Sequence, residues 1–318
     1  RKNSIEVLCE AFVFIRCYVS LLSQSRPITI MTLIFFISVF FIAVENVYSA
    51  PGPIVFGSRD SLQSAMTFLA KYGYSKSDFQ TGNFRTGFRS ALKNYQKFMG
   101  LKQTGYLDTA TVNSMELPRC GVRDGNKRRF ILNSTWPVPK LSYSLLNLPR
   151  DLNLKGTRKA FAYGFRQWAQ VTPLKFLLGQ KNNTDIKIGF YSGDHGDSDP
   201  FNSNQDDVEL AHAFPYPVGV IHFNKDIQWT NKFVNSDDII DLKQVATHEI
   251  GHALGLGHSN LRASIMYPTY NDNMKKPKLH KNDIDWIQKK YGKKKKKNEK
   301  GKPRKVKTKK LQKNNNKI

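Results

Sequence analysis

The chain has 318 residues, of which 40% are apolar, so it is long enough for one or two domains with packed cores. Its formal net charge of +25 is unevenly spread, because residues 293–318 contain fourteen Lys or Arg and a single Glu and so carry +13 of it. Outside this segment the charge is ordinary, which removes most of the support for a nucleic-acid-binding protein.

The N-terminal part contains a targeting pattern. The first methionine is followed by an uncharged apolar run at 32–44 and then by the small residues Ser49 and Ala50. This pattern predicts a signal peptide at 31–49 and therefore a secreted, extracellular protein, and we expect residues 1–30 to be upstream sequence. A retained signal anchor is the alternative, although the run is short for a membrane-spanning helix of ~20 residues.

Cysteine is scarce, with only Cys9, Cys17 and Cys120 in the chain. Cleavage of the signal peptide would remove the first two and leave Cys120 as a single thiol. An odd thiol in a secreted protein indicates a special role for that residue.

The segment after residue 50 is predicted to be a small helical module. Apolar residues recur there at helical spacing, and Asp108 is placed to cap the third helix. An extended linker from Pro118 to Asn126 follows and contains Cys120. The helices are expected at Ser61–Tyr72, Phe84–Met99 and Thr109–Met115.

From residue 130 to 292 the pattern changes to mixed strands and helices, which predicts an α+β domain around one sheet. The Lys/Asn-rich segment 293–318 has almost no apolar content and is predicted to be disordered. We expect strands at Leu141–Leu145, Asp185–Tyr191 and Val220–Phe223, and helices at Thr157–Gln170, Asp241–Leu254 and Lys281–Tyr291.

One motif carries the chemistry of the predicted catalytic site. The segment His248-Glu-Ile-Gly-His252-Ala-Leu-Gly-Leu-Gly-His258 matches H-E-x-x-H-x-x-G-x-x-H, the pattern of metzincin zinc peptidases. The first two histidines share one helix face, and Gly255 can turn the chain so that His258 becomes a third zinc ligand. A fourth position is then left for water, with Glu249 placed as its general base. A helix with incidental histidines is the alternative interpretation.

With this motif the chain resembles the matrix metalloproteinases, or matrixins, over roughly Ser61–Gly292. The resemblance implies a metalloendopeptidase in a minimal form without a hemopexin-like domain. It implies a metzincin-type catalytic domain at 130–292, a twisted mixed sheet with three helices, after a three-helix propeptide domain at 50–129. Residues Ser264–Tyr270 resemble the Met-turn of the family, in which Met266 would lie beneath the zinc ligands. Pro268 and Tyr270 would then wall the pocket for the residue after the cut.

The linker resembles the cysteine-switch motif of the same family at Pro118-Arg-Cys-Gly-Val122. By that resemblance, the Cys120 thiolate fills the fourth zinc position in the inactive precursor. The family has Pro where this chain has Arg123. An activating protease is expected to cut after the switch, and the basic cluster Lys127–Arg129 is a candidate site. A solvated basic loop is the alternative.

A second metal site is also implied by the resemblance. Three histidines and one carboxylate are similar to the structural zinc ligands of the family, and a closed tetrahedral site would pin a long loop to the sheet. Exposed loop histidines are the alternative. The ligands would be His195, Asp197, His212 and His222.

The calcium positions of the family match less well. Asp185 is kept, but Val220 and Asn224 stand where the family has acids, and hard cations prefer carboxylates. The inserted acids Asp206, Asp207 and Glu209 could supply replacements. We therefore expect less calcium dependence than is usual in the family.

Two other function classes remain as rivals to an endopeptidase acting on extracellular or matrix proteins. A secreted, non-catalytic protein could use the basic tail at 293–318 to bind sulfated glycans, as the enzyme itself could. Composition bias alone would also produce such a tail. A nucleic-acid binder is suggested only by charge, and we expect no nucleic-acid partner.

Overall fold

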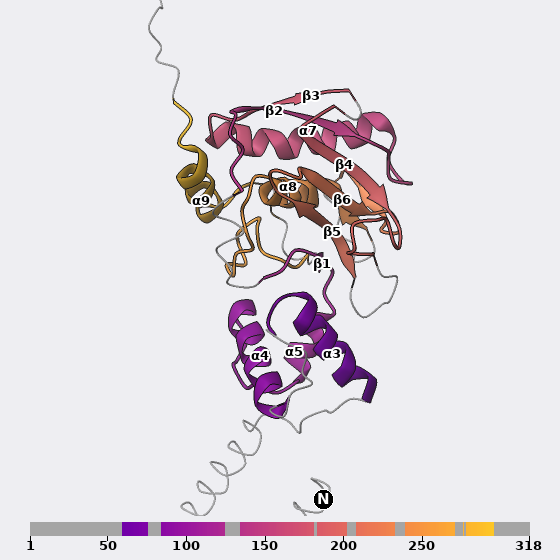
Figure 1. Cartoon of the computed structure of the whole chain (residues 1–318), viewed down its shortest axis with the longest axis vertical. Coiled ribbons are helices and arrows are strands. Elements are labelled where there is room, and N and C mark those ends of the chain that lie inside the picture. Colours follow the sequence, from indigo (N-terminus) through magenta and orange to yellow (C-terminus); the bar gives the residue numbers. More distant parts are fainter. Residues whose placement is uncertain are drawn as a thin grey trace, which may run out of the picture.

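The computed structural model describes residues 59–75, 84–124, 134–180, 183–201, 208–232, 239–270, 276 and 278–295. The predicted signal peptide, the cluster Lys127–Arg129, the inserted Asp206 and Asp207 and most of the basic tail lie outside these residues. None of the helices in the described ranges is both long and apolar enough to cross a membrane. Figure 1 shows a small helical part next to a larger part that is built around a sheet.

The small part consists of three helices around their own core. The side chain of Asp108 accepts a hydrogen bond from the N–H of Thr111 and so caps the third helix, as the sequence predicts. The buried amide of Gln96 donates to Thr111 Oγ1 and to the carbonyl of Tyr106, which fixes the connecting loop. The helices are α3 (Arg59–Lys71), α4 (Phe84–Met99) and α5 (Thr109–Met115).

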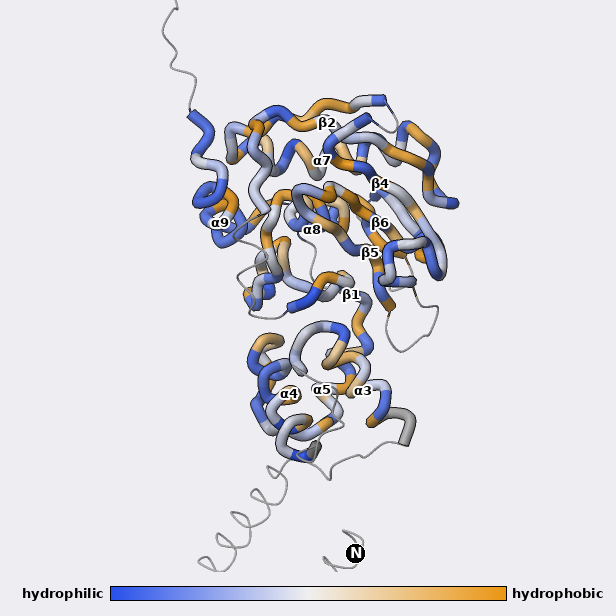
Figure 2. The backbone as a smooth tube through the Cα atoms, in the orientation of Figure 1, coloured by the Kyte–Doolittle hydropathy of each residue, from blue (hydrophilic) through white to orange (hydrophobic). Residues whose placement is uncertain are grey.

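The larger part contains a six-stranded sheet in the order β1-β5-β6-β4-β2-β3. Only β5 and β6 pair antiparallel, and the other neighbours are parallel, so the sheet is mixed. Figure 2 shows hydrophobic residues following the central strands, whereas α9 is mostly hydrophilic. The strands are β1 (Arg119–Cys120), β2 (Lys140–Leu145), β3 (Lys175–Leu178), β4 (Ile186–Tyr191), β5 (Glu209–Phe214) and β6 (Val220–Asn224), with a separate parallel pair β7 (Trp229–Thr230) and β8 (Ile240–Asp241).

Three helices accompany this sheet, which confirms the predicted α+β class. Helix α7 (Leu154–Val171) crosses α8 (Leu242–Ala253) closely at Gly164, where an added Cβ would lie 3.2 Å from the backbone nitrogen of Thr247. The indole of Trp168 donates to the carbonyl of the same Thr247. These contacts hold α8 in place as the scaffold of the site described below, and α9 (Lys281–Tyr291) closes the fold.

Five strands were not predicted from the sequence, namely β1, β3, β5, β7 and β8. All but the last residue of β5 are buried, so the strand lacks the alternation of polar and apolar residues that marks a half-exposed strand. His280 caps α9 by accepting a hydrogen bond from the N–H of Asn282.

Candidate active site

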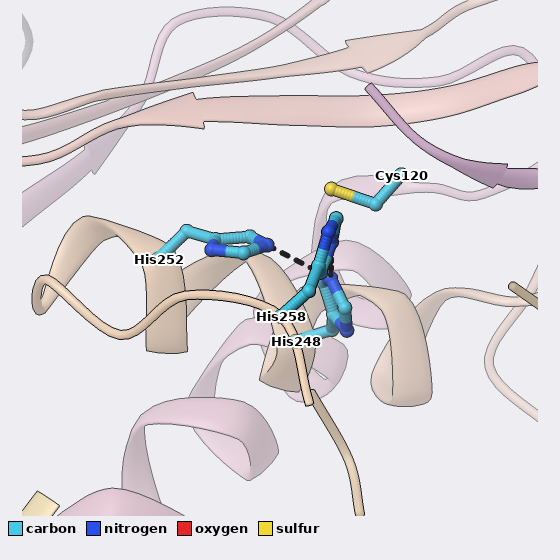
Figure 3. Close-up of side chains that lie close together, drawn as sticks. All are labelled: Cys120, His248, His252 and His258. Atoms are coloured by element: carbon cyan, nitrogen blue, oxygen red, sulfur yellow. Dashed lines mark hydrogen bonds between the residues drawn. The ribbon is translucent and has the colours of Figure 1, made fainter. Parts of the chain in front are cut away.

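Three buried imidazoles converge at the end of α8. His248 and His252 lie on the helix, which ends at Ala253. Gly255 then adopts a positive φ of 84°, and the chain turns back to place His258 beside them. The Nε2 atom of His248 lies 3.0 Å from that of His252 and 3.2 Å from that of His258. Figure 3 shows the three rings grouped below the side chain of Cys120.

Each ring is oriented by a hydrogen bond from its other nitrogen. The Nδ1–H groups of His248 and His252 donate to the carbonyls of Ile265 and Leu256, and that of His258 donates to Asp124 Oδ1 at 2.6 Å. All three Nε2 lone pairs therefore face one another. Burial lowers the pKa of all three histidines, which keeps the rings neutral. Neutral imidazoles with converging lone pairs and fixed Nδ1–H groups fit a zinc ion.

Cys120 completes this group of donor atoms. Its sulfur and the three imidazole nitrogens all lie within 4.8 Å of one another, and the cysteine is buried and free of any disulfide. Strand β1 lies between β5 and the segment at Pro268, and this position brings the thiol to the imidazoles. The N–H of Gly121 bonds to Ala211 of β5, while the N–H of Cys120 bonds to Pro268 on the other side. The linker thus lies between β5 and the segment at Pro268, and the space that it fills is called the groove below.

Glu249 lies beside the first imidazole and is fully buried. Neither of its carboxylate oxygens has a hydrogen-bond partner among the described residues. Burial raises the pKa of its carboxyl to about 8. A buried carboxyl group without a donor needs a polar partner, and a water molecule or a cation would supply one. A cation held by the neighbouring imidazoles would lower this pKa and favour the carboxylate, which is the form that accepts a proton.

Met266 forms the floor of the site. It is fully buried, and its sulfur would lie 2.4 Å from a Cβ added to Gly251, so only glycine fits at that turn of α8. Asp283 of α9 fixes the segment that carries this methionine, since it accepts bonds from the hydroxyl of Ser264 and the N–H of Ile265. The structure thus places Met266 directly beneath the helix of the imidazoles.

A pocket opens next to Glu249 and the thiol. The predicted wall residues Pro268 and Tyr270 line it together with Val245, Tyr267 and Lys276. Lys276 lies with its ammonium 5.0 Å from the centre of the Tyr267 ring. The pocket is mostly apolar, with this one cation at its lining.

The second predicted set of ligands also comes together. His195 Nε2, His212 Nε2 and His222 Nδ1 lie 2.7–2.9 Å from Asp197 Oδ2. His195 and Asp197 come from the loop after β4, whereas His212 and His222 face each other across β5 and β6. Three imidazoles and one carboxylate around a common point fit a closed tetrahedral zinc site.

The residues at the expected calcium positions form hydrogen bonds within the protein. Asp185 Oδ2 accepts from both the N–H and the hydroxyl of Ser142 at 2.7 Å, so this oxygen braces β2 against the start of β4. Asn224 donates to the carbonyl of Glu209 and accepts from the N–H of Asp226. The inserted Glu209 is buried and bonds to His212 instead of facing solvent.

Two contacts of the site were not predicted from the sequence, because Asp124 was not named and Glu209 was considered only as a calcium ligand. Asp124 bonds to both Arg119 and His258, although 134 residues separate it from the histidine. Glu209 bonds to His212 from three residues away on the same strand. Their acidic character is visible in the sequence, but only the fold brings them to the imidazoles. Histidines that bind a metal usually donate their other N–H to a carboxylate or a carbonyl, so a search for such acids could have suggested Asp124 and Glu209.

Comparison with known proteins agrees with this geometry. The matrixin family model matches residues 135–292, and a putative peptidoglycan-binding domain model matches residues 58–115. Metalloendoproteinase 2-MMP of Arabidopsis thaliana is 33% identical over 271 residues, which are 73% of this chain and 71% of that protein. Matrix metalloproteinase-18 of Xenopus laevis is 42% identical over 65% of this chain and 44% of its own length.

Matrilysin of Rattus norvegicus is 40% identical over 64% of this chain and 77% of that protein. This chain is therefore similar both to a plant metalloendoproteinase and to vertebrate matrix metalloproteinases. The helical part α3–α5 corresponds to the propeptide domain of such enzymes. The chain belongs to the matrixin family and is a metalloendopeptidase.

Proposed function

We propose that this protein is a secreted zinc endopeptidase that is synthesised as an inactive precursor. His248, His252 and His258 would hold the catalytic zinc, and Cys120 would occupy its fourth position until the propeptide is removed. The proposal depends mainly on one observation, the convergence of one sulfur and three imidazole nitrogens within 4.8 Å in a buried site.

The residues around the imidazoles have separate tasks in peptide hydrolysis. When bound, zinc lowers the pKa of a water molecule and polarises the scissile carbonyl. Glu249 takes a proton from the attacking water and later returns it to the leaving amine. The pocket beside it, walled by Pro268 and Tyr270, receives the side chain after the cut. Met266 supports the imidazoles from below.

Inactivity of the precursor follows from where the linker lies. It occupies the groove between β5 and Pro268, so a substrate backbone cannot enter while the propeptide is in place. Removal of residues up to 129 by an activating protease, with a cut at the cluster Lys127–Arg129, would empty both the groove and the fourth zinc position.

The second group of ligands would hold a structural zinc. Its carboxylate and one imidazole belong to the loop after β4, whereas the other two imidazoles belong to β5 and β6, so the metal would pin this loop to the sheet. Because Asp185 is already bonded to Ser142, we propose that calcium contributes little at that position. The four ligands are His195, Asp197, His212 and His222.

Substrates and location follow from the sequence and from the family. The predicted signal peptide at 31–49 would direct the chain out of the cell, and extracellular or matrix proteins are the proposed substrates. The basic tail would hold the enzyme on sulfated glycans by salt-sensitive attraction.

Cleavage of a quenched fluorescent collagen-like peptide tests the proposed activity. The precursor is activated by removal of residues up to 129 and compared with Glu249→Gln, which keeps the shape of the side chain but cannot take a proton. We expect the variant to retain its zinc and to lose about 10²–10⁴-fold in kcat. Asp285→Asn, an exposed carboxylate on α9, serves as control and should leave the rate unchanged.

A zinc chelator should also abolish the cleavage. Equal rates for the wild type and Glu249→Gln would overturn the proposed role of Glu249. No cleavage by folded, zinc-loaded wild type would favour a non-catalytic binding protein instead.

A further inference from the structure

Glu209 is a fully buried carboxylate that neither zinc site requires as a ligand. It begins β5, the strand that pairs with β1 of the linker, and its partner in the register is Arg119. The two oxygens of its side chain make different contacts. Oε1 accepts from His212 Nδ1 at 2.7 Å, and Oε2 forms an ion pair with the Nζ of Lys71 at 2.8 Å.

The carboxylate borders the groove that the linker fills. A Cβ added to Gly121 would lie 1.9 Å from Glu209 Oε1, so the carboxylate occupies the space beside the residue that directly follows Cys120. Glu209 is therefore part of the wall of the groove.

The cation that pairs with Glu209 belongs to the propeptide. Lys71 is the last residue of α3, and its side chain is 19% exposed, whereas that of Glu209 is 1% exposed. When the propeptide leaves, the lysine leaves with it, but Glu209 stays because His212 holds its other oxygen. The Oε2 atom then faces the emptied groove without a cation, where a basic side chain of a bound peptide can pair with it.

We propose, on the basis of the function proposed above, that Glu209 determines substrate specificity in the mature enzyme. Its Oε2 atom selects a peptide with a Lys or Arg side chain that takes the place of Lys71. In the precursor, Lys71 occupies the position that the Lys or Arg side chain of the substrate would take. The propeptide thus satisfies the same carboxylate that later recognises the substrate.

Binding of intact peptides tests this inference separately from catalysis. The full chain, with a specific protease site in place of residues 127–129, is activated and freed of its propeptide in a Glu249→Ala background. Six peptides carry a single Lys at successive positions around the cut, and each has a counterpart with Gln. The dissociation constants of each pair are measured with and without the second change Glu209→Gln.

We expect the wild-type residue at 209 to bind one of the Lys peptides about tenfold more tightly than its Gln counterpart, and Glu209→Gln to remove this preference. The amide oxygen of Gln can still accept from His212, so two bound zinc ions and an unchanged melting temperature would show an intact fold. Asp285→Asn is the control and should leave the preference in place.

A Lys preference that survives Glu209→Gln would overturn the inference, as would equal binding within every pair or no measurable binding of any peptide. Failure of the proposed function has a different signature. It would appear as peptides that bind to the protein with intact Glu249 but are not cut.

Discussion

Arg119, the residue directly before Cys120, forms a buried ion pair that holds the linker in place. Its guanidinium is fully buried, donates to both oxygens of Asp124 at 2.8 Å and lies 3.5 Å from the centre of the Tyr72 ring. Asp124 in turn accepts from His258. The arginine thus links the propeptide core to an imidazole of the site through one carboxylate.

Replacement of this arginine should release the thiol. In Arg119→Met the buried Asp124 loses its cation, which costs about 3–5 kcal/mol in similar cases. We expect Cys120 in the precursor to react at least tenfold faster with a thiol reagent, followed by absorbance. Arg150→Met, which breaks an exposed pair with Asp226, is the control and should not change the rate. Equal rates for both variants would contradict the role of Arg119.

Lys276 gives a pH dependence that does not involve a metal ligand. Burial lowers the pKa of its ammonium to about 8, although the carboxylate of Asp283 opposes the shift. Between this value and its ordinary value of 10.5, the unfolded chain binds more protons than the folded one. The free energy of unfolding therefore rises with pH over this interval, and the penalty of the buried charge is complete below pH 8.

Removal of this charge should stabilise the protein at neutral pH. For Lys276→Met we expect a higher free energy of unfolding at pH 7, by up to roughly 3 kcal/mol. The difference from the wild type should shrink as the pH rises from 8 to 10. Urea unfolding at fixed zinc concentration measures the free energy of unfolding of both proteins at each pH. A constant difference across this range would show that the ammonium is not the cause.

Gly121, the residue directly after β1, lets the linker lie close to Glu209 at the start of β5. An alanine at Gly121 would bring its Cβ to 1.9 Å from the carboxylate of Glu209, so strand or carboxylate must move. Such overpacking costs about 1–3 kcal/mol. We expect Gly121→Ala to speed modification of Cys120 in the precursor about tenfold, since 1.4 kcal/mol corresponds to that factor.

Gly87 in α4 offers a matched control for this change. It is exposed, and an added Cβ would meet nothing within 4 Å. Gly87→Ala should stabilise the propeptide helix by roughly 0.5–1 kcal/mol and leave the thiol protected. If Gly121→Ala behaved in the same way, the close approach of β1 to Glu209 would not be important for protection.

The elements that the sequence predicted well are those with strong local rules. Helix α8 follows from the spacing of His248 and His252, and α5 follows from its cap at Asp108. Strands β1 and β3 are short and owe their existence to neighbours far away in the chain. Strand β5 carries His212, so the structure alone explains how this histidine meets His222.

The site was predictable to the extent that its residues share a motif. The spacing of the histidines and of Glu249 predicts a common helix face, and the structure brings the three imidazoles together. The carboxylate partners of the histidines were not predictable from spacing. Asp124 lies 134 residues from His258 and reaches it only through the docked linker. Glu209 lies three residues from His212, and this spacing does not normally place two side chains on one face of a strand.

At the scale of the whole molecule, the propeptide and the catalytic part share one core residue. Tyr267, next to Met266, belongs to the apolar cluster of α3–α5, and its hydroxyl faces the carbonyl of Met99. The propeptide therefore covers the pocket wall as well as the imidazoles. Its removal should open both at once.

Glycan binding by the basic tail can be tested with a deletion that begins after residue 295 and so leaves the contacts with α7 intact. Lys294 donates from its ammonium to the carbonyl of Ala169 and from its backbone N–H to that of Val171, so the chain up to 295 packs on α7. Deletion of 296–318 should leave kcat/KM unchanged but lower the salt concentration that elutes the protein from a heparin column. Unchanged elution would contradict glycan binding by the tail.

X-ray absorption at the zinc edge of the purified precursor tests the central claim most directly, because it reports the ligands of the metal without relying on activity. The account predicts two zinc ions per chain. One of them has a sulfur neighbour at about 2.3 Å, and the other has none, so the average is half a sulfur per zinc ion. In Cys120→Ser this sulfur should be absent while the imidazole nitrogens remain. A precursor with only nitrogen and oxygen neighbours, or a sulfur that persists in Cys120→Ser, would contradict it.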